Sequence, residues 1–194
     1  MGVIIAHIPK CMLKNPQIPL FILIGAFLCL SCVKDTNFDD ADNIVLTPVV
    51  ELDLIYFNLN ASDFFDTISN TPRLQIIDTT EIKFLDDAFV QEDLERAEFL
   101  FNFTNSIPRS FQVGFQFLNE QNDTTYTTQT NVLAGTALDT ETTIFTEAVA
   151  NEEIMDLTRA NKVVVAVTIP SADAALEGML NLKSKTTYFL EIED

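Results

Sequence analysis

Histidine and cysteine are common catalytic bases, nucleophiles and metal ligands, and in this chain they occur only near its start. The single histidine is His7, and the three cysteines are Cys11, Cys29 and Cys32. Beyond Cys32 the sequence contains no imidazole and no thiol. The rest of the chain therefore excludes Ser-His-Asp and Cys-His catalytic systems, zinc sites built from Cys and His, and disulfides.

Carboxylates are the remaining reactive groups, with 29 Asp and Glu against 11 Lys and Arg and a formal net charge of −18 in 194 residues. The densest groups lie at 39–42, 86–87 and 92–95. Oxygen ligands suit calcium, but no twelve-residue loop with Gly at its sixth position and a closing Glu is present. We interpret these groups as solvated acidic surface with no metal site, and calcium binding stays an open alternative. No spacing indicates a glycosidase-type carboxylate pair.

Glycine and charge restrict the ligands further. After the first 31 residues only Gly114, Gly135 and Gly178 remain, so no phosphate-binding loop or dinucleotide fingerprint can form, and we expect no cofactor. The acidic balance repels phosphate backbones, which argues against nucleic acid as a partner. The absence of Trp argues mildly against carbohydrate binding.

The first segment, residues 1–31, has the organisation of a cleaved signal peptide. An uncharged apolar run over 18–30 follows Lys10 and Lys14, and small residues come after it. Thirteen residues are few for a transmembrane helix, which needs about 20, so we predict an export signal, with a short membrane anchor as the alternative. Translation could start at Met1 or at Met12.

The residues that end this run, Leu28-Cys29-Leu30-Ser31-Cys32, resemble the lipobox of bacterial lipoproteins. The resemblance implies that Cys32 becomes the first mature residue and carries acyl chains such as palmitate. Cys29 matches the lipobox less well than Cys32, because Leu28 and not a small residue precedes it. More than one chain is needed for stable anchoring, which a diacylated or triacylated cysteine satisfies.

Residues 32–44 then form the lipidated cysteine and an acidic tether. Lys34 and Asp35, two and three residues past Cys32, resemble the surface-export signal of Bacteroidota lipoproteins. That resemblance implies placement on the outer face of the outer membrane. A plain acidic tether without a sorting role is the alternative.

Residues 45–194 are expected to form one domain, whose clearest pattern is a period-two alternation of phenylalanine. Phe99, Phe101 and Phe103 share one strand face, and 111–117 repeat the pattern after the turn-rich connection 105–110. We predict two strands paired as antiparallel neighbours, forming one wall of the core.

The remaining pattern predicts further strands and a single helix. A short helix begins at Asn151 as its cap, carries Glu152 and Glu153 in its first turn and has Arg159 in its last. The apolar strand over 162–169 is expected to be central. The other predicted strands lie at 49–59, 73–77, 81–85, 125–133, 142–146, 179–183 and 186–193.

These elements predict an all-β fold, a two-layer antiparallel β-sandwich that is immunoglobulin-like in the broad sense, with one short helix. The stretch 98–117, in which Asn105 ends one strand and Pro108 precedes the next, is similar to LEA-2/WHy sandwich domains. This resemblance bears on the fold and not on function.

Three Asp-Thr pairs resemble the acceptor of Bacteroidota O-glycosylation, which makes Thr67, Thr79 and Thr124 candidate modified residues. The nearly uncharged stretch 124–131 is either an edge strand that accepts a partner strand or a decorated, solvated hairpin. We interpret Arg109, which lies among acids, as a local ion-pair partner.

We therefore expect a non-enzymatic lipoprotein of the bacterial outer membrane. It would be lipid-anchored, would face the cell surface, and would act as a binding or accessory module for a protein or envelope component. The alternatives are a periplasm-facing assembly or chaperone lipoprotein and a carboxylate-based hydrolase.

Overall fold

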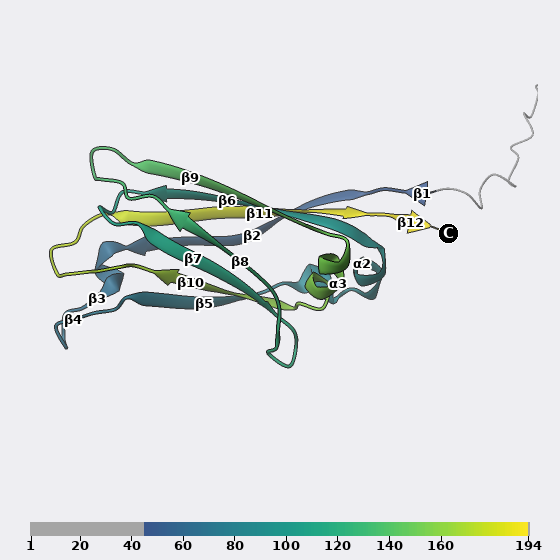
Figure 1. The fold of residues 1–194 in the computed structure, drawn as a ribbon, viewed down its shortest axis with the longest axis horizontal. Coiled ribbons are helices and arrows are strands. Elements are labelled where there is room, and N and C mark those ends of the chain that lie inside the picture. Colours follow the sequence, from purple (N-terminus) through teal and green to yellow (C-terminus); the bar gives the residue numbers. More distant parts are fainter. Residues whose placement is uncertain (1–44, 194) are drawn as a thin grey trace, which may run out of the picture. The chain divides into compact units, whose positions relative to one another are not determined.

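The computed structural model describes residues 45–193, which fall within a compact unit spanning 43–194. This unit is a sandwich of two four-stranded antiparallel sheets, with strand orders β2-β11-β6-β9 and β5-β10-β7-β8 (Figure 1). The predicted all-β sandwich is confirmed. None of the helices in the described residues is long and apolar enough to span a bilayer.

The strands and helices follow the sequence in this order: β1 Val45–Leu46, β2 Val49–Asn60, η2 Ala61–Phe64 (a 3₁₀ turn), β3 Phe65–Asp66, β4 Thr71–Pro72, β5 Gln75–Glu81, η3 Lys83–Asp86 (also 3₁₀), α2 Ala88–Asp93, β6 Leu94–Asn105, β7 Phe111–Leu118, β8 Thr124–Val132, β9 Glu141–Ala150, α3 Glu152–Leu157, β10 Lys162–Thr168, β11 Met179–Leu190 and β12 Ile192–Glu193.

The phenylalanines of β6 and β7 form the centre of the core, as the alternation predicted. The predicted pairing of these two strands is wrong, because they belong to different sheets and face each other across the interior. The ring centroids of Phe101 and Phe115 are 4.1 Å apart, and those of Phe99 and Phe117 are 5.1 Å apart. The connection 106–110 therefore carries the chain from one layer to the other, and the aromatic rings form two facing walls.

Strand β10 is central in its sheet, between β5 and β7, as predicted. Its inward residues Val163, Val165 and Val167 are buried. The two strands predicted over 179–193 are largely one strand, because β11 runs continuously from Met179 to Leu190.

Strand β2 contains a bulge opposite Ser184. Asp53 pairs with Lys185 and Tyr56 pairs with Lys183, so Leu54 and Ile55 together face one residue of β11. The Ser184 hydroxyl closes the gap, because it accepts from the Ile55 amide and donates to the Ile55 carbonyl, both at 2.9 Å.

Two local predictions fail. The strand predicted over 81–85 is wrong: β5 ends at Glu81, and the following residues turn into η3 so that Ile82 and Leu85 can be buried. A second helix, α2, was not predicted. Its N-cap is Asp87, whose carboxylate accepts a hydrogen bond from the Phe89 amide at 3.0 Å.

Helix α3 lies where the sequence placed it, but its start differs from the prediction. Asn151 occupies the N-cap position with φ of 56° and makes no side-chain capping bond. The helix ends at Leu157, so Arg159 lies just beyond the last turn, where it pairs with Asp156.

The two ends of the sandwich carry different elements (Figure 1). At one end, the entry end, β1 pairs with β12 and the helices α2 and α3 lie close by. At the other, the loop end, the segments 61–74, 106–110, 133–140 and 169–178 come together.

Candidate functional site

The predicted anchoring and sorting residues, Cys32, Lys34 and Asp35, lie outside the described residues. The assignments of residues 1–31 as a signal and 32–44 as a tether also lie there. They stay predictions from the sequence.

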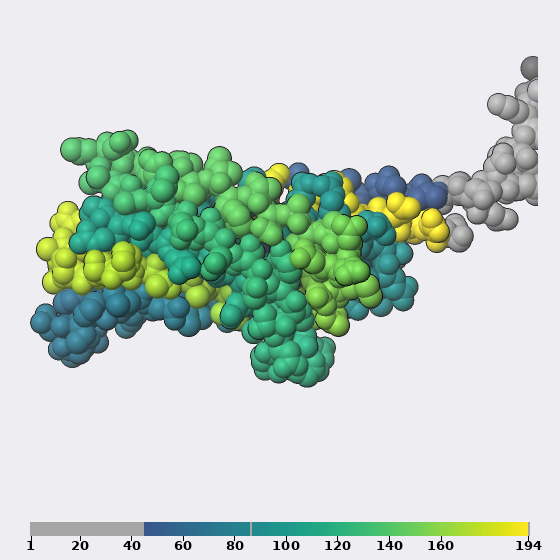
Figure 2. Space-filling view, in the orientation of Figure 1, coloured from purple at the N-terminus to yellow at the C-terminus, as the bar shows by residue number. Residues whose placement is uncertain are grey.

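The three candidate acceptor threonines are all exposed, at separate places. Thr67 follows β3 in a turn, Thr79 lies on β5, and Thr124 begins β8 beside the hairpin tip that projects from the body (Figure 2). The carboxylate of Asp66 accepts hydrogen bonds from the backbone amides of Ile68 (2.8 Å) and Ser69 (3.3 Å), and these bonds lower the pKa of Asp66. The structure does not bring the three threonines into one site.

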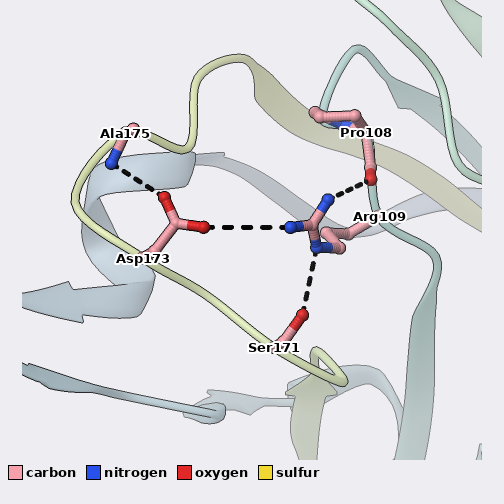
Figure 3. A network of polar contacts seen from close by, with 5 residues as sticks. All are labelled: Pro108, Arg109, Ser171, Asp173 and Ala175. Carbon is pink, nitrogen blue, oxygen red and sulfur yellow. Dashed lines mark hydrogen bonds and ion pairs between the residues drawn. The ribbon is translucent and has the colours of Figure 1, made fainter.

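Arg109 lies at the loop end and is fully engaged by its neighbours (Figure 3). Its guanidinium donates to the Ser171 hydroxyl at 3.1 Å and to the Pro108 carbonyl at 2.8 Å, and it lies 3.8 Å from Asp173. Asp173 in turn accepts from the Ala175 amide at 2.9 Å. The interpretation of Arg109 as a local ion-pair partner is confirmed.

Asn105, which ends β6, ties the loop end together. Its side chain is fully buried, donates to the carbonyls of Arg109 (2.9 Å) and Leu133 (2.8 Å), and accepts from the Ile107 amide (2.9 Å). Gly135 packs so closely that a Cβ there would lie 1.8 Å from the Asn105 carbonyl oxygen. Every polar atom of this amide is used within the fold, so Asn105 has a structural role.

The side of the sandwich between β8 and β9, here called the closed side, is sealed. Tyr126 of β8 donates its hydroxyl to Glu147 of β9 at 2.6 Å, and the Leu133 amide donates to Thr143 at 3.2 Å. The Phe145 ring lies 5.8 Å from that of Phe101 in the core. Burial and the neighbouring Glu147 carboxylate raise the pKa of Tyr126, which keeps its hydroxyl a donor.

The opposite side, between β2 and β5, is open. Each of these strands is the last in its sheet, with a single hydrogen-bonded neighbour, β11 and β10 respectively. Two hollows lie between them. The first, of about 340 Å³, is lined near the entry end by Leu52, Leu54 and Phe84 among others, and the second, of about 170 Å³, is lined mainly by Phe57, Leu59, Ile76, Val165 and Val167.

The bulge of β2 explains why apolar residues line the open side along its whole length. Before the bulge Val50, Leu52 and Leu54 face inward, and after it Ile55, Phe57 and Leu59 do, because the extra residue reverses the alternation. Of these only Ile55 is buried, since no residue within 45–193 covers the edge.

Polar groups also face the open side. The buried Thr186 lines the first hollow with Tyr188, whose pKa burial raises to about 12. Asp78 of β5 pairs with Val165 of β10 across the ladder, so both side chains point toward the interior of the sandwich. Both residues line the second hollow. Asp78 is exposed nonetheless, because β5 is an edge strand.

The open side is therefore the candidate functional site. It offers an apolar surface, two free strand edges and one inward carboxylate, which suits binding. In residues 45–193, no group of three His, Cys, Asp or Glu side chains is placed to hold a metal ion. Sequence reasoning missed this site. It gave 124–131 as an edge strand or a solvated hairpin, and β8 is indeed the last strand of its sheet, but it lies on the closed side, where Tyr126 bonds to Glu147 of β9. The adjacent apolar pair Leu54-Ile55, which breaks the alternation of β2, was the available signal.

Comparison with known proteins gives only distant likenesses. No family model and no curated protein matches the sequence. Among solved structures, a Parabacteroides distasonis protein described as secreted shares 14% identity at a TM-score of 0.43, over 59% of this chain and 37% of that one. The VP2 subviral particle of infectious bursal disease virus shares 10% identity at a TM-score of 0.45, over 74% and 32%. This chain thus spans about a third of the length of those proteins, and similarity at this level gives no information on what it binds.

Proposed function

We propose that this protein is a lipid-anchored, non-enzymatic binding or accessory module of the bacterial outer membrane, facing the cell surface. The observation that carries the proposal is the apolar run ending at Ser31-Cys32, followed within thirteen residues by the first strand of the sandwich at Val45. Acyl chains on Cys32 would moor the domain, and removal of Lys10 and Lys14 would leave it still more acidic.

The tether supports this arrangement by its length. Twelve residues, 33–44, separate the cysteine from β1. An extended chain spans at most about 3.3–3.6 Å per residue, so the domain would sit within roughly 40 Å of the bilayer surface. Within the described residues, the loop end lies opposite β1 (Figure 1).

A binding role is supported by the open side rather than by any reactive group. The apolar hollows and free strand edges give a surface for a partner, in a domain whose sequence after Cys32 has no thiol and no imidazole. The partner would be a protein or an envelope component.

Metabolic labelling with an alkyne analogue of palmitate tests the anchor directly. We expect label on the wild-type protein and on the Cys29→Ala control, and none on Cys32→Ala. Mass spectrometry should find the mature chain starting at a modified Cys32. An unmodified Cys32, or residues 1–31 retained in mature protein, would contradict the proposal.

Protease treatment of intact cells tests the orientation. Loss of the protein before lysis supports surface exposure. The double variant Lys34→Ala, Asp35→Ala should then resist the protease as long as the cells are intact. Full protection of the wild-type protein until lysis would favour the alternative, a periplasm-facing lipoprotein that acts in envelope assembly or as a chaperone.

The exposure of Thr67, Thr79 and Thr124 is compatible with O-glycosylation at the surface. Glycopeptide mass spectrometry of protein from the native host should find the added mass on these residues. The buried Thr186 serves as an internal negative control.

A further inference from the structure

The open side combines two features that a single kind of ligand would satisfy together. Among the described residues, the strands that border it are unpaired on one edge, so their outer backbone amides and carbonyls can bond another strand. The outer amide of Thr79 donates at present to the Asp78 carboxylate at 2.8 Å and would have to exchange that bond for one to the added strand. The inward side chains of β2 are apolar and, apart from Ile55, not fully buried, and β5 adds the half-buried Ile76, in contrast to the fully buried inward side chains of β6 and β7.

An extended peptide matches this surface because of its own geometry. Successive side chains of a strand point to opposite faces, so a strand added to the sheet edge would turn every second side chain toward the hollows. A compact apolar ligand would fill a hollow but would leave the strand edges unpaired.

Strand β5 is better suited than β2 to receive such a strand. Its ladder with β10 runs over seven consecutive residues without a break, from Gln75 to Glu81. The β2 edge is interrupted by the bulge at Leu54 and Ile55, which disturbs regular pairing.

Asp78, at the middle of β5, favours a basic residue at the matching position of an added strand. Its carboxylate lies on the inward face beside Val165 and lines the same hollow as Phe57 and Ile76. The carboxylate accepts a hydrogen bond from the Thr79 amide at 2.8 Å, but no lysine or arginine of the described residues forms an ion pair with it. A strand that covered it with an apolar or acidic residue would desolvate this charge, whereas a lysine or arginine opposite would pair with it. The formal net charge of −18 would also attract a basic segment.

We propose that the open side binds an extended segment of a partner protein, added as a strand to the β5 edge. Alternate apolar side chains of the segment fill the hollows between β2 and β5, and a basic side chain lies opposite Asp78. This inference deepens the proposed binding role and does not depend on the acyl anchor.

Three nine-residue fluorescent peptides serve as probes. The first alternates valine and threonine, with one lysine replacing the central valine. The second carries glutamate at that position, and the third carries prolines at two threonine positions, which prevents it from forming a strand ladder. Fluorescence polarisation measures their binding to full-length Cys32→Ala protein, which cannot be acylated at Cys32.

We expect the lysine peptide to bind at least tenfold more tightly than the glutamate and proline peptides. Asp78→Lys should reverse the preference between lysine and glutamate, and Asp78→Asn should reduce it to less than threefold. The matched control Asp123→Lys makes the same change in net charge on the exposed β7–β8 connection and should keep the wild-type preference. Hydrogen exchange should show new protection at 75–81 and none on β8 or β9.

Several results would overturn the proposal: no binding of the lysine peptide, equal binding of the proline peptide, or protection confined to β8 and β9. Equal strengthening of all peptides by Asp78→Asn would also do so, since Asp78 would then only guard the edge against aggregation. None of these results bears on acylation of Cys32, and loss of palmitate labelling would leave the peptide result unchanged.

Discussion

The closed and open sides of the sandwich differ in composition and in how their inward side chains are covered, because β8 and β9 are rich in threonine whereas β2 is mainly apolar. On the closed side a hydroxyl–carboxylate bond between Tyr126 and Glu147 joins β8 to β9, and Phe145 packs against the central Phe101. On the open side, β2 and β5 leave Phe57 and Ile76 half-exposed above two hollows. The difference indicates that the closed side supports stability, whereas the open side gives up apolar burial and remains available to a ligand.

Matched phenylalanine truncations should show the largest contrast. Phe101→Ala removes a ring stacked on Phe115 and Phe145, and we expect a loss of about 3–5 kcal/mol in unfolding free energy. Phe57→Ala, on the open side, should cost only about 1 kcal/mol because its ring already contacts water. Urea unfolding of the full-length protein measures both, and equal losses would contradict the contrast between the sides.

Asn105→Ala should have the next largest effect, because it acts on the loop that completes the closed side. The change leaves the carbonyls of Arg109 and Leu133 and the amide of Ile107 without their partner. Buried groups left unpaired should cost about 2–3 kcal/mol in total. Hydrogen exchange should become faster first in the β8–β9 connection. Faster exchange confined to β2 and β5 would contradict the role of Asn105 in holding this connection.

High pH should destabilise the domain through its buried tyrosines. Burial raises the pKa of Tyr188 to about 12 from an ordinary value of 10, so the unfolded chain loses that proton first. The stabilising contribution is complete below about pH 10 and is lost as the pH rises toward 12, by roughly 2 kcal/mol at pH 12. Thermal melts between pH 9 and pH 12 should show the fall, and Tyr188→Phe should flatten it. An identical pH profile in that variant would exclude Tyr188 as a cause.

The smallest effect concerns the bond that joins the two strands of the closed side. Tyr126→Phe removes the donor to Glu147 and should cost about 1 kcal/mol. Its control is Tyr56→Phe on β2, where the exposed hydroxyl contacts only Asn58, and we expect a change of less than about 0.5 kcal/mol. Equal losses of unfolding free energy in the two variants would mean that the hydrogen bond from Tyr126 to Glu147 does not stabilise the contact between β8 and β9.

Much of the sandwich could be predicted from side-chain alternation, but the assignment of strands to sheets could not. The pattern of phenylalanines at 99–103 and 111–117 gives the strands and their buried faces. It does not distinguish two neighbours in one sheet from two strands that face each other, because both arrangements bury the same side chains. The deciding contacts are those of Asn105 with Arg109 and Leu133, which fix the turn between the layers.

The local errors have similar causes. Residues 82–85 alternate like a strand, but the burial of Ile82 and Leu85 at the entry end favours a 3₁₀ turn. The candidate site was missed because an exposed edge depends on which strands lie last in each sheet, which is a property of topology. The threonine acceptors could be proposed from sequence, and their exposure is compatible with that role.

The short pairing of β1 with β12 has a mechanical consequence. If acyl chains on Cys32 anchor the protein as proposed, a pulling force would reach Val45 and Leu46 before the rest of the domain, and this ladder joins only two residue pairs. The twelve-residue strand β2 that follows is paired along β11 over most of its length. Under such a load we expect β1 to separate from β12 first, while β2 stays paired with β11.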